Sequence, residues 1–225
     1  MGGVCSSSTK GASAAQPAAP NKSVVPAVLS PLMIKKLTRW FEVVDVDKNG
    51  SLTHSDFVAV VANITAYPGC PKALKQELSE GFDNWWKYEV SQGGATHVSL
   101  DTFLAQAAMS RCYPENLPNS IKSVAPTASL LFQAMDRNQN GTITLEEFAL
   151  FHESMGIYDA ASTKLTFTAI DVNKNGTISL QEYISACIEF FFGENAQNGA
   201  TYLYGPIEPK SWDLCRTATI CFRGN

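Results

Sequence analysis

Apolar residues between positions 33 and 44 recur three and four residues apart, which is the spacing of one buried face of an α-helix. This stripe comprises Met33, Ile34, Leu37, Trp40, Phe41 and Val44. Ser30 suits an N-cap and Pro31 suits the first helical position, so we expect the helix to begin there. After a polar stretch, the same spacing returns at Phe57, Val60, Val61 and Ile64. The pattern predicts a helix, a polar loop and a second helix.

The same helix–loop–helix pattern occurs twice in the second half of the chain. The apolar positions around residues 136–147 are Leu130, Leu131 and Met135 before, and Phe148, Leu150 and Phe151 after. Those around residues 171–182 are Leu165 and Phe167 before, and Tyr183, Ile184, Cys187, Phe190 and Phe191 after. The two polar stretches begin 35 residues apart, which leaves room for two helices and a short connection near Gly156. We therefore expect an all-α fold.

The three polar stretches share one motif. They read DVDKNGSLTHSD at 45–56, DRNQNGTITLEE at 136–147 and DVNKNGTISLQE at 171–182. All match the EF-hand pattern D-x-[DN]-x-[DN]-G-x5-[DE], in which a 12-residue loop supplies calcium ligands from positions 1, 3, 5, 7, 9 and 12. Asn-Gly turns in polar linkers are the alternative, but they would not keep acid, glycine, apolar residue and terminal acid at fixed offsets.

Each loop offers six candidate metal ligands. In loop one they are Asp45, Asp47, Asn49, Ser51, Thr53 and Asp56. In loop three they are Asp136, Asn138, Asn140, Thr142, Thr144 and Glu147. In loop four they are Asp171, Asn173, Asn175, Thr177, Ser179 and Glu182. The seventh position would bind through its backbone carbonyl, and the ninth directly or through water.

Loop one differs from the other two at its last position, where Asp56 replaces Glu. Glutamate reaches far enough to bind calcium through both oxygens, whereas aspartate is one methylene shorter. A ligand that binds through one oxygen leaves a smaller, nearly octahedral shell, which magnesium tolerates better. We therefore expect three calcium sites, with magnesium possible at the first. A weaker calcium site and an empty loop are the alternatives there.

A degenerate loop lies between loops one and three. VSLDTF at 98–103 resembles ITLEEF at 143–148, which places this loop two at residues 91–102. Its ligand positions carry no carboxylate, so it should not bind calcium. We expect an incoming helix over 71–90 and pairing of Val98 with Leu52, since the apolar eighth position joins two loops. The chain then divides into EF-hand pairs at 30–115 and 116–207, packed into one compact body.

Composition excludes several classes of protein. A formal net charge of −4 provides no basic field for nucleic acid. No apolar stretch of about 18 residues is present, so we expect no transmembrane helix. No secretory leader is expected either, and the six cysteines show no metal-type spacing, which favours reduced thiols and a cytoplasmic location. The chain shows no nucleophile motif or phosphate loop, and we expect it not to be an enzyme.

With these motifs, the chain resembles the sarcoplasmic calcium-binding protein family, which includes calexcitin-like, luciferin-binding and photoprotein members. The resemblance rests on the three loops, the degenerate second loop and FFFGENAQNGATYLYGPI at 190–207. It implies two facing lobes around an aromatic interior, and a tail that folds back over the core. The photoproteins carry histidines at the positions of Leu37 and Cys187, so their absence argues against light emission.

The resemblance implies a calcium buffer, a calcium sensor or a calcium-regulated carrier of a hydrophobic molecule. Five methionines are too few for a Met-lined sensor groove. A carrier needs a cavity, which Trp40, Trp85, Trp86, Phe103 and Tyr183 would line, although such aromatic stripes usually form plain core. We expect a buffer or signalling protein, with the carrier as the alternative. His54, His97 and His152 are expected at the surface.

The two ends of the chain lie outside the repeats. MGGVCS fits an N-myristoylation motif, with Gly2 as acceptor and Cys5 as a site for palmitate, which would allow membrane association. An unmodified tail is the alternative. Residues 1–29 resemble a flexible tether rich in Ala, Ser and Pro. Residues 208–225 form an extension to which the sequence assigns no role.

Overall fold

The computed structural model describes residues 29–111 and 117–207. The helices of the first half are α1 (Pro31–Val44), α2 (His54–Ile64), α3 (Lys72–Trp85), the π-helical turn η1 (Trp86–Val90) and α4 (Leu100–Arg111). Those of the second half are α5 (Leu117–Met135), α6 (Leu145–Ser154), α7 (Ala160–Ile170), α8 (Leu180–Phe192) and the 3-10 turn η3 (Gly199–Tyr202). The strands are β1 (Ser51–Leu52), β2 (Val98–Ser99), β3 (Thr142–Ile143) and β4 (Ile178–Ser179).

The strands join the helix–loop–helix units in two pairs. β1 and β2 are antiparallel, with Leu52 opposite Val98, and β3 and β4 place Ile143 opposite Ile178. All four of these apolar residues are fully buried. The predicted pairing through the eighth loop position is therefore confirmed, including the partnership of loop one with the degenerate loop two.

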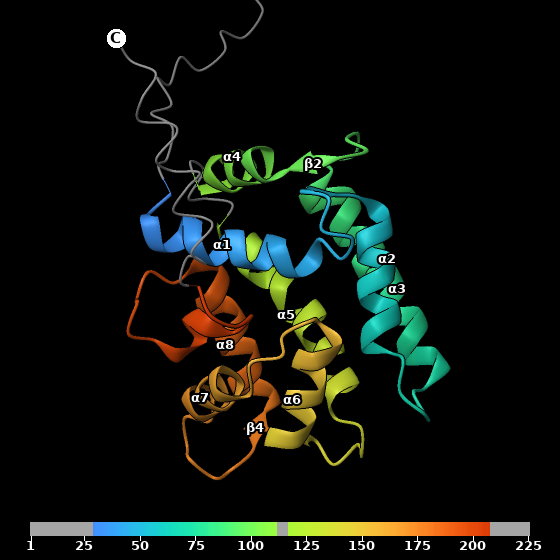
Figure 1. Cartoon of the computed structure of the whole chain (residues 1–225), viewed down its shortest axis with the longest axis vertical. Helices are drawn as coiled ribbons and strands as arrows, with labels where there is room; N and C mark the ends of the chain where they lie inside the picture. Colours follow the sequence, from blue (N-terminus) through green and yellow to red (C-terminus); the bar gives the residue numbers. More distant parts are fainter. Residues whose placement is uncertain (1–28, 112–116, 208–225) are drawn as a thin grey trace, which may run out of the picture.

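The two pairs share one core. Figure 1 shows α1 and α4 towards one end of the molecule and α6 to α8 towards the other, with α2 and α3 along one side and α5 between them. A single cluster of buried apolar residues extends through both pairs. Its first-pair part is aromatic: the ring of Trp40 stacks on Phe103 at 5.1 Å and lies 5.2 Å from Trp85. The expected all-α body built from two EF-hand pairs is confirmed.

Helix α1 begins where the sequence indicates. The Ser30 hydroxyl accepts a hydrogen bond of 3.0 Å from the Met33 amide, and Pro31 occupies the first turn. Helix α7 departs from the expected stripe, because Leu165 is exposed while Thr163 and Thr166 are buried. The hydroxyls of these threonines form hydrogen bonds with other elements. Polar side chains can therefore occupy the core side of α7, where the apolar pattern predicted a leucine.

The C-terminal end of α8 is held by cations from two other helices. Lys36 of α1 donates to the carbonyl oxygens of Glu189 at 2.9 Å and Gly193 at 2.7 Å. Arg111 of α4 donates to the carbonyl oxygen of Phe191. The last carbonyls of a helix lack intrahelical donors, and this end of the helix carries partial negative charge. Lys36 and Arg111 supply the missing donors and offset the charge. Burial lowers the pKa of Lys36 to about 8, against the opposing effect of the carboxylates of Glu189 and Glu194.

After α8, residues 193–207 form a C-terminal strap that folds back over the core. Ala200, Thr201, Leu203 and Tyr204 of this strap are buried. The Tyr204 ring packs against Phe190 with 4.8 Å between ring centroids. The tail therefore lies where the family resemblance implied.

Some expectations fall outside the described residues. The boundary between residues 115 and 116, the modification sites Gly2 and Cys5 and the extension 208–225 are among them. Within the described ranges, no helix is both long and apolar enough to cross a membrane.

We predict that Gly199→Ala destabilises the protein by about 1–3 kcal/mol, the usual cost of overpacking. A Cβ on Gly199 would overlap the side chain of Ala169 on α7 and approach its Cα to 3.2 Å. The strap would therefore have to move away from α7. Urea unfolding of both proteins measures the difference.

Gly193→Ala is the matched control. A Cβ at Gly193 meets only the carboxylate end of Glu189, which can rotate away. Equal destabilisation by the two substitutions would show that α7 and the strap are not closely packed at Gly199.

Candidate metal sites and interior cavity

Loops one, three and four have the same backbone turn. Their fourth residues, Lys48, Gln139 and Lys174, all adopt a left-handed conformation with φ of 57°. Their sixth residues, Gly50, Gly141 and Gly176, have φ between 81° and 85°. Side chains with a Cβ rarely adopt this second conformation, so glycine is needed at this position to wrap the chain around a central point.

The first aspartate of each loop points to that centre and is buried. The Asp45 carboxylate accepts hydrogen bonds from the amides of Asn49 at 3.2 Å and Gly50 at 2.9 Å. Asp136 and Asp171 accept the equivalent pairs of bonds in loops three and four. These bonds fix the carboxylate that begins each ligand set.

The last carboxylate folds back over each loop. Glu182 accepts hydrogen bonds from the amides of Val172 at 3.1 Å and Asn173 at 3.3 Å. In loop one, the hydrogen bond that Asp56 accepts from the start of the loop comes from the amide of Val46, at 3.1 Å. In loop three, the side-chain amide of Asn138 donates to the Glu147 carboxylate at 3.1 Å. The twelfth-position carboxylate therefore lies against the second or third residue of its own loop in all three cases.

The ninth position of each loop serves as an N-cap. The hydroxyls of Thr53, Thr144 and Ser179 donate to the twelfth-position carboxylate at 2.7 to 2.9 Å. Each hydroxyl therefore lies against the carboxylate of the twelfth position. Contact of the ninth position with an ion, directly or through water, stays a prediction.

Electrostatics distinguishes loop one from the others. Asp45, Asp47 and Asp56 place one carboxylate oxygen each within 4.8 Å of one another, the one acidic cluster of three in the described residues. Burial raises the pKa of Asp45, and its carboxylate neighbours raise it further. In loop four, burial also favours a higher pKa for Glu182, but hydrogen bonds from Ser179, Asn173 and Val172 outweigh it and lower the pKa. A divalent cation would relieve the repulsion in loop one.

Loop two has a different backbone. Its left-handed residues are Gln92, with φ of 48°, and Gly93, with φ of 77°, which are its second and third positions. The Ser91 hydroxyl at position one donates to the Lys87 carbonyl at 3.2 Å instead of facing a centre. Ser99 and Thr102 bond to each other at 3.0 Å. Besides lacking carboxylates, loop two therefore also lacks the backbone turn that loops one, three and four share.

Between the two pairs lies a cavity of about 290 Å³. Trp40, Trp85 and Phe103 line it, but Trp86 and Tyr183 do not, so the predicted lining is correct in three of its five residues. Leu37 and Cys187 also line the cavity. These two residues stand where the resemblance places photoprotein histidines, and the fold brings them to one space.

The strap closes one side of this cavity. Three successive strap carbonyls accept hydrogen bonds from three helices: Tyr202 from Thr166 at 3.2 Å, Leu203 from His152 at 3.1 Å and Tyr204 from Arg39 at 2.8 Å. The Tyr204 side chain lines the cavity. Side chains from α1, α6 and α7 therefore hold the wall of the cavity in place.

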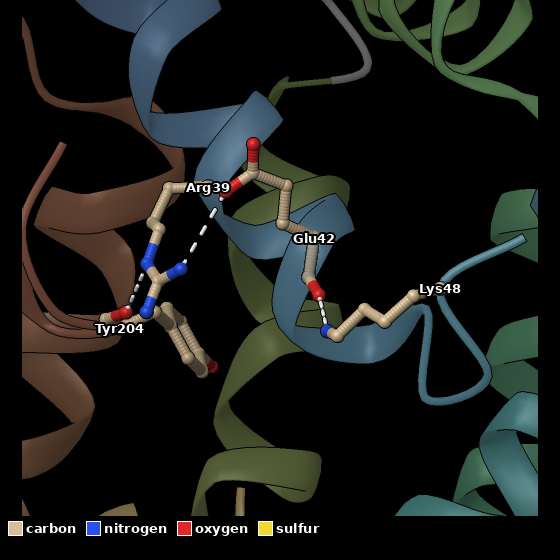
Figure 2. A network of polar contacts seen from close by, with 4 residues as sticks. All are labelled: Arg39, Glu42, Lys48 and Tyr204. Atoms are coloured by element: carbon tan, nitrogen blue, oxygen red, sulfur yellow. Dashed lines mark hydrogen bonds and ion pairs between the residues drawn. The ribbon is translucent and has the colours of Figure 1, made fainter. Parts of the chain in front are cut away.

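Arg39 also connects the strap to loop one. Figure 2 shows its guanidinium between the Tyr204 carbonyl and the Glu42 carboxylate, which lies 3.5 Å away. The Glu42 carbonyl accepts a hydrogen bond from Lys48, the fourth residue of loop one. Helix α1 thus contacts both a metal loop and the strap.

The expectation that His152 lies at the surface is wrong. Its ring is buried between the Thr163 hydroxyl, 2.8 Å from Nδ1, and the Leu203 carbonyl. Since a carbonyl only accepts, Nε2 carries the proton and Nδ1 accepts from Thr163. The sequence held one signal that His152 is buried, because this residue follows the apolar Phe148 at the four-residue spacing of one helix face. His54 and His97 are exposed, as expected.

Comparisons with known proteins agree with this geometry. A family model described as an EF-hand domain pair matches residues 129–188, and one described as EF hand matches residues 38–61. A sarcoplasmic calcium-binding protein of Perinereis vancaurica tetradentata is 24% identical over 129 residues, which is 57% of this chain and 72% of that protein. The resemblance to this family and the EF-hand character of the loops are confirmed.

Solved structures support the same fold. The photoprotein clytin superposes with a TM-score of 0.64 and 20% identity, covering 80% of this chain and 96% of clytin. A coelenterazine-binding protein from Renilla muelleri, in its calcium-loaded apo form, has a TM-score of 0.58 and 19% identity, covering 79% and 99%. At these identities the likeness concerns the fold.

We predict that His152 makes stability depend on pH. Burial lowers the pKa of His152 to about 4, with Arg39 adding to the effect and the Leu203 carbonyl opposing it. The unfolded chain gains a proton near pH 6.5, whereas the folded protein does not until about pH 4, so stability falls as pH falls through this window. Wild type should lose about 2 kcal/mol more than His152→Gln between pH 7 and pH 5.

Urea unfolding at saturating calcium measures this difference, and His54→Gln serves as the exposed-histidine control. Parallel pH profiles for wild type and His152→Gln would mean that His152 is protonated in the folded protein.

Proposed function

This chain is an EF-hand calcium-binding protein related to the sarcoplasmic calcium-binding proteins, and we propose that it binds three calcium ions as a buffer or signalling protein. One observation carries the number three: loops one, three and four share the same left-handed turn and the same inward first and twelfth carboxylates, while loop two has neither.

The ligand set fits calcium in its chemistry. Each loop offers carboxylate, amide and carbonyl oxygens, which are the hard ligands that calcium prefers. When bound, the ion would supply positive charge at the centre of the loop and draw these oxygens together. The first aspartate, already fixed by two amides, would bind with little loss of conformational entropy.

We further propose a non-catalytic role in the cytoplasm. In an EF-hand sensor, calcium exposes an apolar groove rich in methionine. Here Met33 and Met135 are buried inside the core, Met155 is partly buried and Met109 is exposed on another helix, and five methionines occur in the whole chain. This distribution favours a buffer over a sensor with a methionine-lined groove.

Magnesium is proposed as a competing ion at loop one. Asp56 makes a single contact across its loop, to the amide of Val46, whereas Glu182 makes two across loop four. The shorter side chain would bind through one oxygen, which suits the six-coordinate shell of magnesium.

The second candidate function is carriage of a hydrophobic small molecule. The observation that favours it is the cavity of about 290 Å³ between the two pairs, lined by aromatic rings and by the charged residues Glu89 and Arg111. A structural neighbour with the same fold is named a coelenterazine-binding protein. In this function, the ion sites would regulate binding through helix α1, which reaches both loop one and the strap.

We predict that Glu147→Gln weakens calcium binding at loop three by roughly tenfold or more, because a twelfth-position carboxylate is replaced by a neutral amide. Isothermal titration of wild type should give three ions, and the variant should give two in the same concentration range. The dye ANS, added in parallel, reports any apolar surface that calcium exposes.

Glu146→Gln is the matched control, since Glu146 is the exposed neighbour on the same helix. The proposal fails if wild type binds two ions or fewer, or if the control loses a site as readily as Glu147→Gln.

We predict that Asp56→Glu increases the preference of loop one for calcium over magnesium by about tenfold, because the longer side chain binds calcium through both oxygens. Calcium titrations with and without excess magnesium measure this preference. Asp159→Glu, at an exposed aspartate that caps α7 outside the loops, is the control. An unchanged preference in Asp56→Glu would contradict the role given to this side chain.

A further inference from the structure

Helix α7 and the residues next to it carry an apolar stripe that faces solvent. The stripe comprises Tyr158, Ala161, Leu165 and Val172, which are all exposed. Tyr158 is 80% exposed, Leu165 73% and Val172 75%, and no other large apolar side chain in the described residues is as exposed as these three. They follow one another at intervals of seven residues, which is about two helical turns. Single exposed apolar residues are ordinary, but an aligned set indicates a surface that another segment covers.

The other side of α7 is fixed in the core, so the helix cannot turn the stripe inward. Thr163 and Thr166 on that side are buried, and their hydroxyls are hydrogen-bonded to the His152 ring and the Tyr202 carbonyl. The helix contains a single charged residue, Lys164. Its outer side therefore lacks the charged groups that usually occupy the solvent face of a helix.

The C-terminal strap leads the chain to the start of this stripe. Successive strap residues contact Ala169 and then Thr166, so the strap runs in the direction opposite to α7. Gly205 of the strap then lies beside Ile157, the neighbour of Tyr158, because a Cβ on Gly205 would come within 3.2 Å of the Ile157 side chain. The chain therefore approaches its C-terminal extension close to the first residue of the stripe.

The far end of the stripe belongs to a metal loop. Val172 is the second residue of loop four, and its amide donates to the Glu182 carboxylate at 3.1 Å. Val46, the equivalent residue of loop one, is partly buried and packs against the core. Loop four thus presents to solvent an apolar side chain that loop one packs inside.

We propose that residues 208–225, which lie outside the described part of the chain, pack on this stripe and cover it. The segment has apolar side chains of its own at Trp212, Leu214, Ile220 and Phe222. Along a helix the stripe would span about 21 Å, at about 1.5 Å per residue. The segment could extend to about 60 Å, so it is long enough to turn back at Tyr158 and follow α7 to Val172.

A segment of the same chain has an advantage over a second copy of the protein as the cover. Gly205 is held beside Ile157, and few residues separate it from Trp212. A short tether of this kind gives an effective concentration on the order of millimolar. A weak apolar contact would therefore form within one molecule at protein concentrations at which two molecules stay apart.

Disulfide trapping in the full chain tests the proposal, because the segment contains Cys215 and Cys221. Single cysteines are placed along the stripe by Tyr158→Cys, Leu165→Cys and Val172→Cys. Val58→Cys, at an exposed apolar position of α2, is the matched control. Each dilute protein is treated with oxidised glutathione at saturating calcium, and peptide mapping then identifies every new disulfide.

We expect at least one stripe variant to form an intramolecular disulfide with Cys215 or Cys221 about tenfold faster than Val58→Cys, because the cover raises the local concentration of these thiols. If no stripe variant forms a disulfide with the segment, or if Val58→Cys forms one as fast, the proposal is overturned. Disulfides between two molecules at the stripe would assign it to a second copy and would also overturn it.

A second measurement asks whether the cover stabilises the protein. In the full chain, Leu165→Lys should raise the equilibrium constant of unfolding about tenfold, as expected when a buried leucine is lost. It should change little in a segment variant that carries serine at the four apolar positions, because Leu165 would then be exposed. Urea unfolding at saturating calcium measures both. Val58→Lys is the control and should act equally in both backgrounds, whereas equal effects of Leu165→Lys in both would show that the segment does not cover Leu165.

Discussion

The C-terminal end of α8 depends on donors from outside its own helix. Lys36 and Arg111, on α1 and α4, donate to carbonyls that the helix leaves without partners. Both donors come from the first EF-hand pair, and the helix they complete belongs to the second. Because α8 begins at loop four, lines the cavity and leads into the strap, the position of all three depends on this contact between the pairs. A charged group is buried at some cost to make it, as the lowered pKa of Lys36 shows.

This dependence connects the ion sites to the interior. Helix α1 supplies Lys36 to α8, Arg39 to the strap and Trp40 to the cavity, and its C-cap is Asp45, the first residue of loop one. A movement of α1 on ion binding would therefore also move the strap. The two candidate functions use the same helices, and a buffer of this fold differs from a regulated carrier chiefly in whether the interior space is filled.

The shared turn of the three loops could be predicted because its residues are set by contacts within 12 residues, which the sequence records as fixed offsets. Pairing of Leu52 with Val98 followed from the same local rule. His152 and Lys36 could not be placed in this way, since their partners Leu203 and Gly193 lie 51 and 157 residues further along the chain. The size of the cavity could not be predicted from the sequence either, because the space between the rings depends on the angles between five helices. Leu165 shows the same limit, as apolar spacing did not tell which side of α7 faces the core.

The ligand positions of loop one carry three carboxylates, and those of loops three and four carry two each, with amides completing the sets. The formal net charge of the chain is only −4, while three bound calcium ions would add six positive charges. A fully loaded molecule would then carry a formal net charge of +2, so ion binding reverses the sign of its long-range field. Partners or surfaces that repel the empty protein at a distance would attract the loaded one, whatever happens to its apolar interior.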